Sequence, residues 1–230
     1  MSEHERVTKA YQRRSDGELS SRYCLFNRGN LQHLQERERV LLRMLKKCFG
    51  GSVRERRVLD IGCGRGGTLL PMLLYRFKPQ NCFGVDILED RIADARTLLP
   101  NVTFACCSAE AIPFEKETFD LVTMFTCLSS VLDKEIRAKI CRQAIEMLRP
   151  GGWVLIYDFR VDNPSNPDVS AVRLSELKGH FPGMNCSSRT LTLLPPLARL
   201  TGRYSPSLCG ILALVPFLRT HRMTIFQKPL

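Results

Sequence analysis

The sequence predicts an α/β fold, a mainly parallel sheet with helices on both faces. Short apolar runs that read as buried strands alternate with helical segments, which is the pattern of βαβ units. A glycine-rich turn directly follows the first of these strands. The composition, 44% apolar and 25% charged over 230 residues, is that of a soluble globular protein and excludes global disorder.

Two helices are expected ahead of the sheet. One covers Glu5–Arg14, and the second covers Leu31–Phe49, where leucines recur at helical spacing opposite Arg and Lys side chains. Gly50-Gly51 ends the second helix. We therefore divide the chain into an N-terminal helical cap, residues 1–50, and a main domain, residues 51–230.

The middle of the chain carries the alternating elements. Strands are expected at Arg57–Ile61, Cys82–Ile87, Val102–Cys107, Phe119–Phe125 and Trp153–Asp158. Helices are expected at Thr68–Phe77, at Glu89–Leu99, and from an Asp133 cap to Leu148, where Arg149-Pro-Gly-Gly152 ends the last of them.

The last third of the chain is less regular. A helix is expected at Val169–Lys178, and strands at Ser187–Leu193 and Arg222–Phe226. Between those two strands lies an insertion, residues 194–220, that contains four prolines and is too long for a hairpin loop. We consider this insertion a candidate lid.

The sharpest motif is Val58-Leu-Asp-Ile-Gly-Cys-Gly-Arg-Gly-Gly67. Glycines between a strand and a helix let the backbone approach a nucleotide-type cofactor, and Gly62, Gly64 and Gly67 also fit the dinucleotide pattern. Taken alone, this motif leaves a nicotinamide dehydrogenase open. Asp60 argues against it, because a carboxylate at the turn would repel a pyrophosphate and attract a cation. A cationic cofactor such as S-adenosylmethionine fits better.

Five motifs together resemble the class I S-adenosylmethionine-dependent methyltransferases, over roughly residues 40–160. They are, in order, Val58–Gly66, Gly84-Val-Asp86, Ala109-Glu-Ala-Ile-Pro-Phe114, Phe119-Asp-Leu-Val122 and Leu148-Arg-Pro-Gly-Gly152. Later segments are similar to a bacterial, methyltransferase type 11-like subgroup whose substrates we cannot name. The resemblance implies a Rossmann-like fold with seven strands, an insertion before the last strand, and S-adenosylmethionine as cofactor.

The resemblance also implies which residues bind the cofactor. Asp60 would lie near the amino group of the methionine part, and Asp86 would hold both ribose hydroxyls. The other implied contacts are the turn of Gly62, Cys63, Gly64 and Gly66, the packing of Ile87 on adenine, the loop of Ser108, Ala109 and Glu110, and the carbonyl of Phe125. Ser108 stands where many relatives have Asp, so a contact to the adenine amino group is not implied there.

Candidate catalytic residues are fewer. Asp158 ends the fifth strand and would accept a proton from the acceptor, unless it pairs with Arg160 or a loop N–H. His221, before the last strand, is the second candidate, with a polar residue at the sheet edge as the alternative. Cys127 is expected in the core. No C-x-x-C pair is present, and we expect no metal site.

Charge is concentrated at the two ends. The net charge is +11, with +7 in residues 1–57, −2 in 58–158 and +6 in 159–230, counting Lys and Arg against Asp and Glu. Basic flanks suit a small or amphiphilic, anionic acceptor, including a lipid- or saccharide-linked one, or simply form a solvated surface. We expect an O- or N-methyltransferase. The alternatives are an RNA methyltransferase, disfavoured because no Asp/Asn-Pro-Pro-Tyr motif follows strand four, and a non-catalytic adenosylmethionine-binding regulator.

Two expectations concern location and surface. The first ten residues contain no apolar stretch typical of a signal peptide, so we expect a cytoplasmic protein. The run at residues 207–218 would be apolar on every face of a helix, so it is either core or an interface. Arginines flank it, which makes peripheral membrane contact an option. The sequence indicates no oligomeric state.

Overall fold

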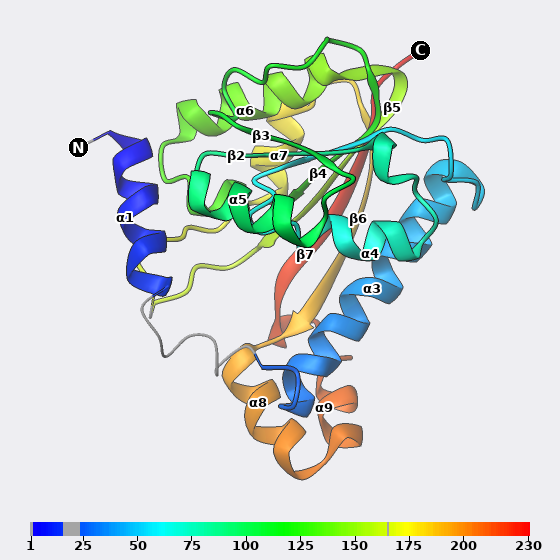
Figure 1. Cartoon of the computed structure of the whole chain (residues 1–230). Coiled ribbons are helices and arrows are strands. Elements are labelled where there is room, and N and C mark those ends of the chain that lie inside the picture. The colour runs from blue at the N-terminus through cyan, green and yellow to red at the C-terminus, as the bar shows by residue number, and fades with distance from the viewer. Residues whose placement is uncertain (1, 16–23, 165) are drawn as a thin grey trace.

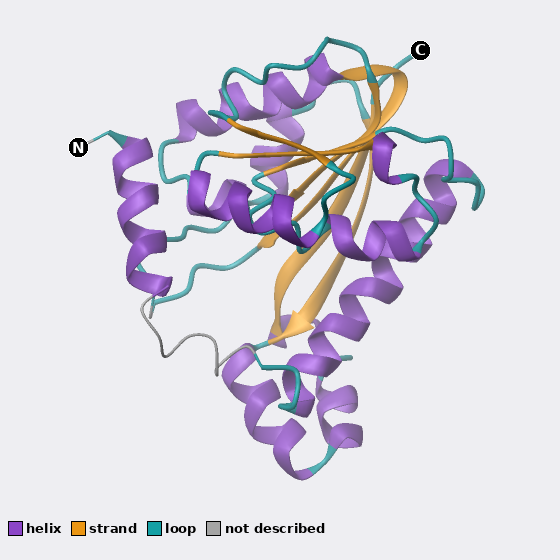
Figure 2. Ribbon diagram, viewed as in Figure 1, coloured by secondary structure: helices purple, strands orange, loops and turns teal. Residues whose placement is uncertain are grey.

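A seven-stranded sheet forms the centre of the protein (Figures 1 and 2). The computed structural model describes residues 2–15, 24–164 and 166–230. The strands are β1 Val58–Ile61, β2 Cys82–Asp86, β3 Thr103–Cys106, β4 Phe119–Phe125, β5 Leu148–Phe159, β6 Asn185–Leu193 and β7 Arg219–Gln227. Their order is β3-β2-β1-β4-β5-β7-β6, and β7 runs in the opposite direction to the other strands described in this sheet. The predicted α/β fold with a mainly parallel sheet is confirmed.

The strand register brings the predicted motifs to one edge of the sheet. Asp60 of β1 is level with Gly84 of β2 and with Thr123 of β4. Because these strands are parallel, the residues that follow their carboxyl ends meet at the same edge. The glycine-rich turn, Asp86 and Phe125 all lie there.

Helices cover both faces (Figure 2). The helices α3 Arg28–Phe49, α4 Leu69–Leu74 and α5 Glu89–Leu98 pack on one face through buried side chains such as Leu41, Met72 and Ile92. The helices α6 Lys134–Met147 and α7 Leu174–His180 pack on the other, where Ile140 and Phe181 are buried. Each face therefore has its own hydrophobic core, as expected for a sheet covered on both sides.

Two helix ends are set by capping residues that are recognisable in the sequence. Gly50 adopts φ +64° after α3, a conformation that glycine tolerates best, and its N–H bonds the Lys46 carbonyl. The Asp133 carboxylate accepts the N–H groups of Glu135 and Ile136 at 2.8 and 3.2 Å, the predicted N-cap of α6.

Three predicted elements have other boundaries. Helix α4 is shorter than expected and stops at Leu74, since Arg76 has φ +80°. The Arg149–Gly152 segment, expected as a helix terminator, lies inside β5, where Leu148 pairs with Phe119. Helix α7 begins five residues late because the N–H groups of Ser170 and Val172 bond the Ser129 and Phe159 carbonyls instead.

The insertion contains two helices and a 3-10 turn that the sequence analysis did not predict. They are α8 Pro195–Tyr204, α9 Pro206–Leu212 and η3 Pro216–Leu218, each with proline in its first turn. Helix α8 crosses the start of α3 at van der Waals distance: a Cβ on Gly202 would lie 2.4 Å from the Gly29 nitrogen. Because β6 runs parallel to β5, the insertion leaves the sheet at the carboxyl edge (Figure 1).

No helix in the described ranges combines the length and the apolar character that crossing a membrane requires.

Candidate active site

The turn after β1 is built from glycines in the left-handed region. Gly62, Gly64 and Gly66 have φ of +73°, +52° and +80°. The N–H groups of Gly62 and Cys63 both donate to the Val85 carbonyl, at 2.8 and 3.0 Å, which ties the turn to β2. A Cβ on Gly62 would lie 2.7 Å from the Cys127 sulfur, so no larger residue fits. Gly66 faces Leu99 and does not line the cavity described below.

Asp86 connects the turn to the next loop. Its Oδ2 accepts the Gly64 N–H at 2.8 Å, and its Oδ1 accepts the Leu88 N–H at 3.0 Å. The carboxylate stays partly exposed at the end of β2 and lines the cavity. Each of its oxygens retains a second lone pair that can accept a ligand hydroxyl.

Asp60 is buried directly beneath the turn, with 1% of its surface exposed. Its Oδ1 accepts the Thr123 hydroxyl at 2.6 Å, whereas Oδ2 has no hydrogen-bond partner among the residues the structure describes. Burial, with a smaller contribution from the negative charge of Asp86, raises the pKa of Asp60 to about 7. A buried carboxylate oxygen without a donor is costly, so this atom is suited to a cationic ligand group.

The loop after β3 supplies another wall. Ser108, Ala109 and Glu110 line the cavity together with Ile87. The Ser108 hydroxyl accepts the Glu110 N–H at 3.2 Å, and the Glu110 carboxylate pairs with Lys139 at 3.1 Å. The Glu110 side chain is thus held toward α6.

The end of β4 closes the floor. Thr126 has φ +50°, its N–H bonds the Tyr157 carbonyl at 2.7 Å, and its hydroxyl donates to the Phe125 carbonyl at 2.8 Å. Cys127, expected in the core, lines the cavity instead, and burial raises the pKa of its thiol well above the ordinary value. A thiol held protonated is a poor nucleophile.

These residues surround a cavity of about 800 Å³, a volume typical of small-ligand sites. Nine of the eleven residues that we expected to bind the cofactor line it. They are Gly62, Cys63, Gly64, Asp86, Ile87, Ser108, Ala109, Glu110 and Phe125. Asp60 and Gly66 lie behind the turn and shape it from below.

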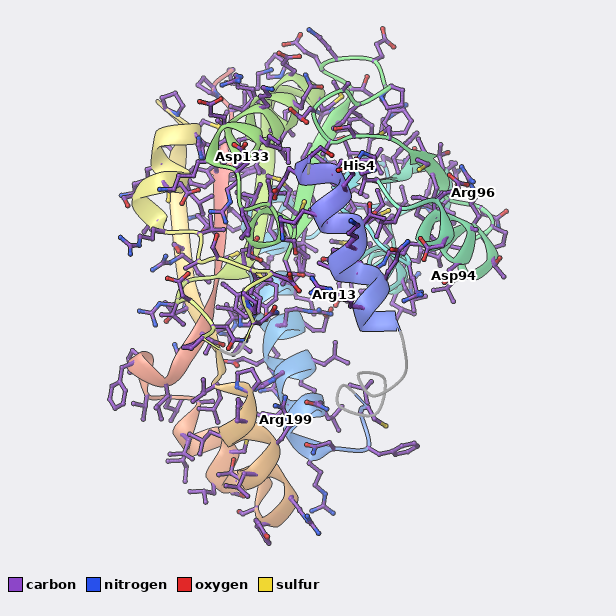
Figure 3. The ribbon with its side chains drawn as sticks, turned by 90° about the vertical axis from the view of Figure 1, so that its left-hand side faces the viewer. His4, Arg13, Asp94, Arg96, Asp133 and Arg199 are labelled. Carbon is purple, nitrogen blue, oxygen red and sulfur yellow. The ribbon has the colours of Figure 1, made fainter. Side chains whose placement is uncertain are left out.

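Helix α1 Glu3–Ser15 forms the opposite wall, with Glu3, His4, Val7 and Tyr11 on the cavity. The Tyr11 hydroxyl bonds the Ser130 hydroxyl at 3.0 Å, and the Glu3 carboxylate accepts the Leu132 N–H at 2.6 Å. Figure 3 shows His4 and Arg13 toward the two ends of this helix.

None of these α1 residues was expected at the site from the sequence. The same holds for Arg37 of α3 and Arg91 of α5, which also line the cavity. The Arg91 guanidinium lies 4.0 Å from the Tyr11 ring centroid, and that of Arg37 lies 5.8 Å from the Phe125 ring centroid. These contacts join segments far apart in the sequence, and the predicted N-terminal helix was their only signal. None of the residues described in the 194–220 insertion lines the cavity, so the insertion is not its wall.

The two residues expected to be catalytic do not line the cavity either. Asp158 is buried and accepts the Ser129 N–H at 3.1 Å and its neighbour's N–H at 2.9 Å, with a pKa raised by burial to about 6. Asp158 thus bonds a loop N–H, which was the alternative to a catalytic role in the sequence analysis. His221 is also buried and stacks on Tyr157, and burial lowers its pKa to about 3. A catalytic role for either side chain stays a prediction that this placement does not favour.

Comparison with known proteins identifies the type of domain in the middle of the chain. Residues 58–152 match the family described as "Methyltransferase domain", and this range contains the glycine turn, Asp86 and the floor of the cavity. The matched segment carries all five motifs that resemble the class I S-adenosylmethionine-dependent methyltransferases. The residues around the cavity suit S-adenosylmethionine: the unpartnered Asp60 oxygen lies below a turn whose glycines leave room for a ligand.

Relatives of the chain carry names that refer to different acceptor atoms. Erythromycin 3''-O-methyltransferase of Saccharopolyspora erythraea is 34% identical over 66% of this chain and 52% of its own length. The tRNA N(3)-methylcytidine methyltransferase Mettl2 of Drosophila melanogaster is 29% identical over 46% of this chain and 35% of its own. The chain thus spans about a third to a half of these relatives.

A solved structure shares the fold. Phosphoethanolamine N-methyltransferase 2 of Haemonchus contortus, in complex with S-adenosyl-L-methionine, superposes with a TM-score of 0.61 at 21% identity. The match covers 82% of this chain and 52% of that protein.

Proposed function

We propose that this chain transfers a methyl group from S-adenosylmethionine to an oxygen or nitrogen of a small or amphiphilic, anionic acceptor. One observation carries the proposal: a single cavity joins the glycine turn and Asp86 to a wall that holds Arg37, Arg91 and His4. The first part suits the cofactor, and the second leaves space for an acceptor beside it.

On the cofactor side, Asp86 would accept the ribose hydroxyls while it holds Gly64, and Asp60 would receive the methionine ammonium. Ile87 and the Ser108–Glu110 loop would enclose the adenine, and the Phe125 carbonyl would face the ammonium. Apart from Asp60, which lies beneath the glycine turn, these residues all line one cavity, and their placement supports the assignments.

On the acceptor side, two guanidinium groups favour a negatively charged molecule. Arg91 is stacked on Tyr11, and Arg37 forms an ion pair with Glu38 at 2.9 Å. Phosphate- or carboxylate-bearing saccharides and lipid headgroups share the required chemistry.

When bound, S-adenosylmethionine would supply an electrophilic methyl group: an acceptor lone pair would form the new bond to this carbon as the carbon–sulfur bond breaks, with S-adenosylhomocysteine as the leaving group. Positioning of the acceptor provides much of the rate acceleration, and a base is needed only where the acceptor atom keeps its proton. Among the described residues that line the cavity, His4 carries an imidazole. We therefore assign removal of the acceptor proton to His4, and not to Asp158 or His221.

RNA methylation is the second candidate, favoured by the net charge of +11 and by the likeness to a tRNA methyltransferase. A nucleotide base would have to enter beneath α1, whose contacts to Ser130 and Leu132 would then break. A regulator that binds the cofactor without turnover is the third candidate.

A cytoplasmic location belongs to the same proposal. All ten cysteines lie in the described part of the chain, and none forms a disulfide. Unpaired, partly exposed thiols such as Cys106 and Cys186 suit a reducing compartment.

Calorimetric titration with S-adenosylmethionine, followed by methyl-transfer assays on anionic saccharides, phospholipids, amines and RNA, tests the proposal. We expect one cofactor site and transfer to a non-nucleic-acid acceptor. Transfer to RNA alone would favour the second candidate, and binding without any transfer would favour the third. No cofactor binding would reject all three.

A further inference from the structure

Helices α8 and α9 and the turn after them expose large apolar side chains. Phe217, Tyr204 and Leu214 are 81%, 74% and 70% exposed. We call the following set the apolar patch: Leu200, Tyr204, Leu208, Ile211, Leu214 and Phe217. Exposed apolar groups on this scale mark an interaction surface more often than a solvated one.

The fold does not need these side chains. Leu200 and Tyr204 are four residues apart on α8, and Leu208 and Ile211 are three apart on α9, so each pair shares one helix face. The inner faces of both helices form a small core of their own, made of Leu193, Ala198, Cys209 and Ala213. The patch is therefore a second face that no described residue covers.

A third segment adds to this surface. Leu25 and Phe26, just before α3, are 51% and 98% exposed. The contact of Gly29 with Gly202 fixes this segment beside α8. Figure 1 shows α8, α9 and the start of α3 together at one end of the molecule.

The segment that carries the patch has charged side chains of one sign. The stretch from residue 177 to 230 contains no Asp or Glu and seven Lys or Arg. Arg203 on α8 and Arg28 at the start of α3 are exposed, and neither is part of an ion pair between described residues. Arg199 lies on α8 as well (Figure 3). Apolar side chains bordered by unpaired arginines complement a surface that is apolar inside and anionic at its rim.

We propose that the apolar patch docks on an anionic lipid surface. A second copy of the chain suits it less, because self-association would bring the arginines of two copies together. The insertion leaves the sheet at its carboxyl edge, the edge that holds the cavity. Docking would bring that edge close to the lipid headgroups. This inference goes beyond the proposed function, and its test does not involve turnover.

Vesicle sedimentation without cofactor tests the docking. We expect the full chain to bind phosphatidylcholine vesicles that contain phosphatidylglycerol, to bind pure phosphatidylcholine weakly, and to be released by added salt. Ile211→Glu/Phe217→Glu should abolish binding. Arg199→Gln/Arg203→Gln should weaken binding about tenfold or more, since each arginine near such a surface contributes to it.

Leu74→Glu is the matched control. Leu74 is 77% exposed at the end of α4, away from the patch, so this variant should bind vesicles as the parent does. Circular dichroism and cofactor titration of every variant separate lost docking from lost folding or a lost cofactor site. Failure of the parent to bind anionic vesicles at low salt overturns the proposal. So does a parent dimer, seen by light scattering, that Ile211→Glu/Phe217→Glu dissociates.

Discussion

Asp60 and Thr123 lie on neighbouring strands, and the Thr123 hydroxyl donates to Asp60 Oδ1 at 2.6 Å. The threonine therefore orients the carboxylate and satisfies one of its oxygens. The other, Oδ2, is left without a described donor in a site where burial raises the pKa of Asp60 to about 7. The charge on this residue is then sensitive to pH near neutrality and to any cation bound beside it.

The first prediction concerns this charge. The ionised form attracts the cofactor ammonium, so affinity for S-adenosylmethionine should rise as pH increases from about 6 to about 8, through the pKa of Asp60. Asp60→Asn should bind more weakly and lose this contribution to the pH dependence. Calorimetry at several pH values measures both effects. Equal affinity of variant and parent would contradict the assignment.

The same shift affects stability. In the folded chain the pKa of Asp60, about 7, lies above its unfolded value of about 3.8. The contribution of the Asp60 carboxyl to folding stability is therefore fully present below pH 3.8 and is lost as pH rises through 7. Asp60→Asn cannot ionise, and without cofactor it should unfold less readily than the parent at about pH 8. Denaturant melts at acidic and alkaline pH check the sign.

The second prediction concerns Asp86. Asp86→Ala should weaken cofactor binding by about 1.5–3 kcal/mol, because hydrogen bonds from ribose hydroxyls to a charged acceptor are lost and Gly64 is released. Asp90→Ala is the control, since Asp90 is exposed on α5 and does not line the cavity. Identical titrations for Asp86→Ala and the parent would remove the ribose role.

The third prediction uses two glycines of the same turn. Gly62→Ala places a methyl group 2.7 Å from the Cys127 sulfur at φ +73°, which should cost roughly 2–5 kcal/mol of stability and abolish cofactor binding. Gly67→Ala meets no atom within 4 Å and should be tolerated. Thermal melts and titration compare the pair. Equal behaviour of the two variants would mean that the turn relaxes freely.

The fourth prediction concerns His4. For an acceptor that keeps its proton, His4→Ala should lower kcat by about 100-fold or more, and added imidazole should restore part of the loss. His180→Ala on α7, which does not line the cavity, should leave kcat unchanged. An unaffected kcat in His4→Ala assigns proton removal to another group or to solvent.

Much of the architecture was predictable because local signals and the fold agree. Each strand from β1 to β7 overlaps a strand expected from the sequence, and Asp133 and Gly50 bound helices as their chemistry requires. Asp86 was found through the motif Gly84-Val-Asp86, and it lies at the end of β2.

The acceptor wall was not predictable, since it depends on long-range contacts. His4 and Tyr11 reach the cavity only because α1 bonds Ser130 and Leu132, more than 100 residues later. Asp158 lies near the end of β5 as expected, but the position in a strand does not reveal which way a side chain points. His221 was expected before the last strand, whereas it lies within β7, an interior strand of the sheet. Both point into the interior. The helices of the insertion were not predicted because the segment is rich in proline, a residue that breaks a helix when it lies in the interior. In α8 and α9 the prolines lie in the first turn, where a helix accepts them.

The contact between Gly29 and Gly202 has a consequence for evolution. A Cβ on Gly29 would lie 2.1 Å from the Ala198 carbonyl oxygen, and one on Gly202 would lie 2.4 Å from the Gly29 nitrogen. Neither glycine can be replaced by a larger residue while α8 remains packed against α3. In an alignment of homologous chains the two glycines should be retained together or replaced together. The pair then serves as a marker that distinguishes chains with this insertion docked from those that have lost it.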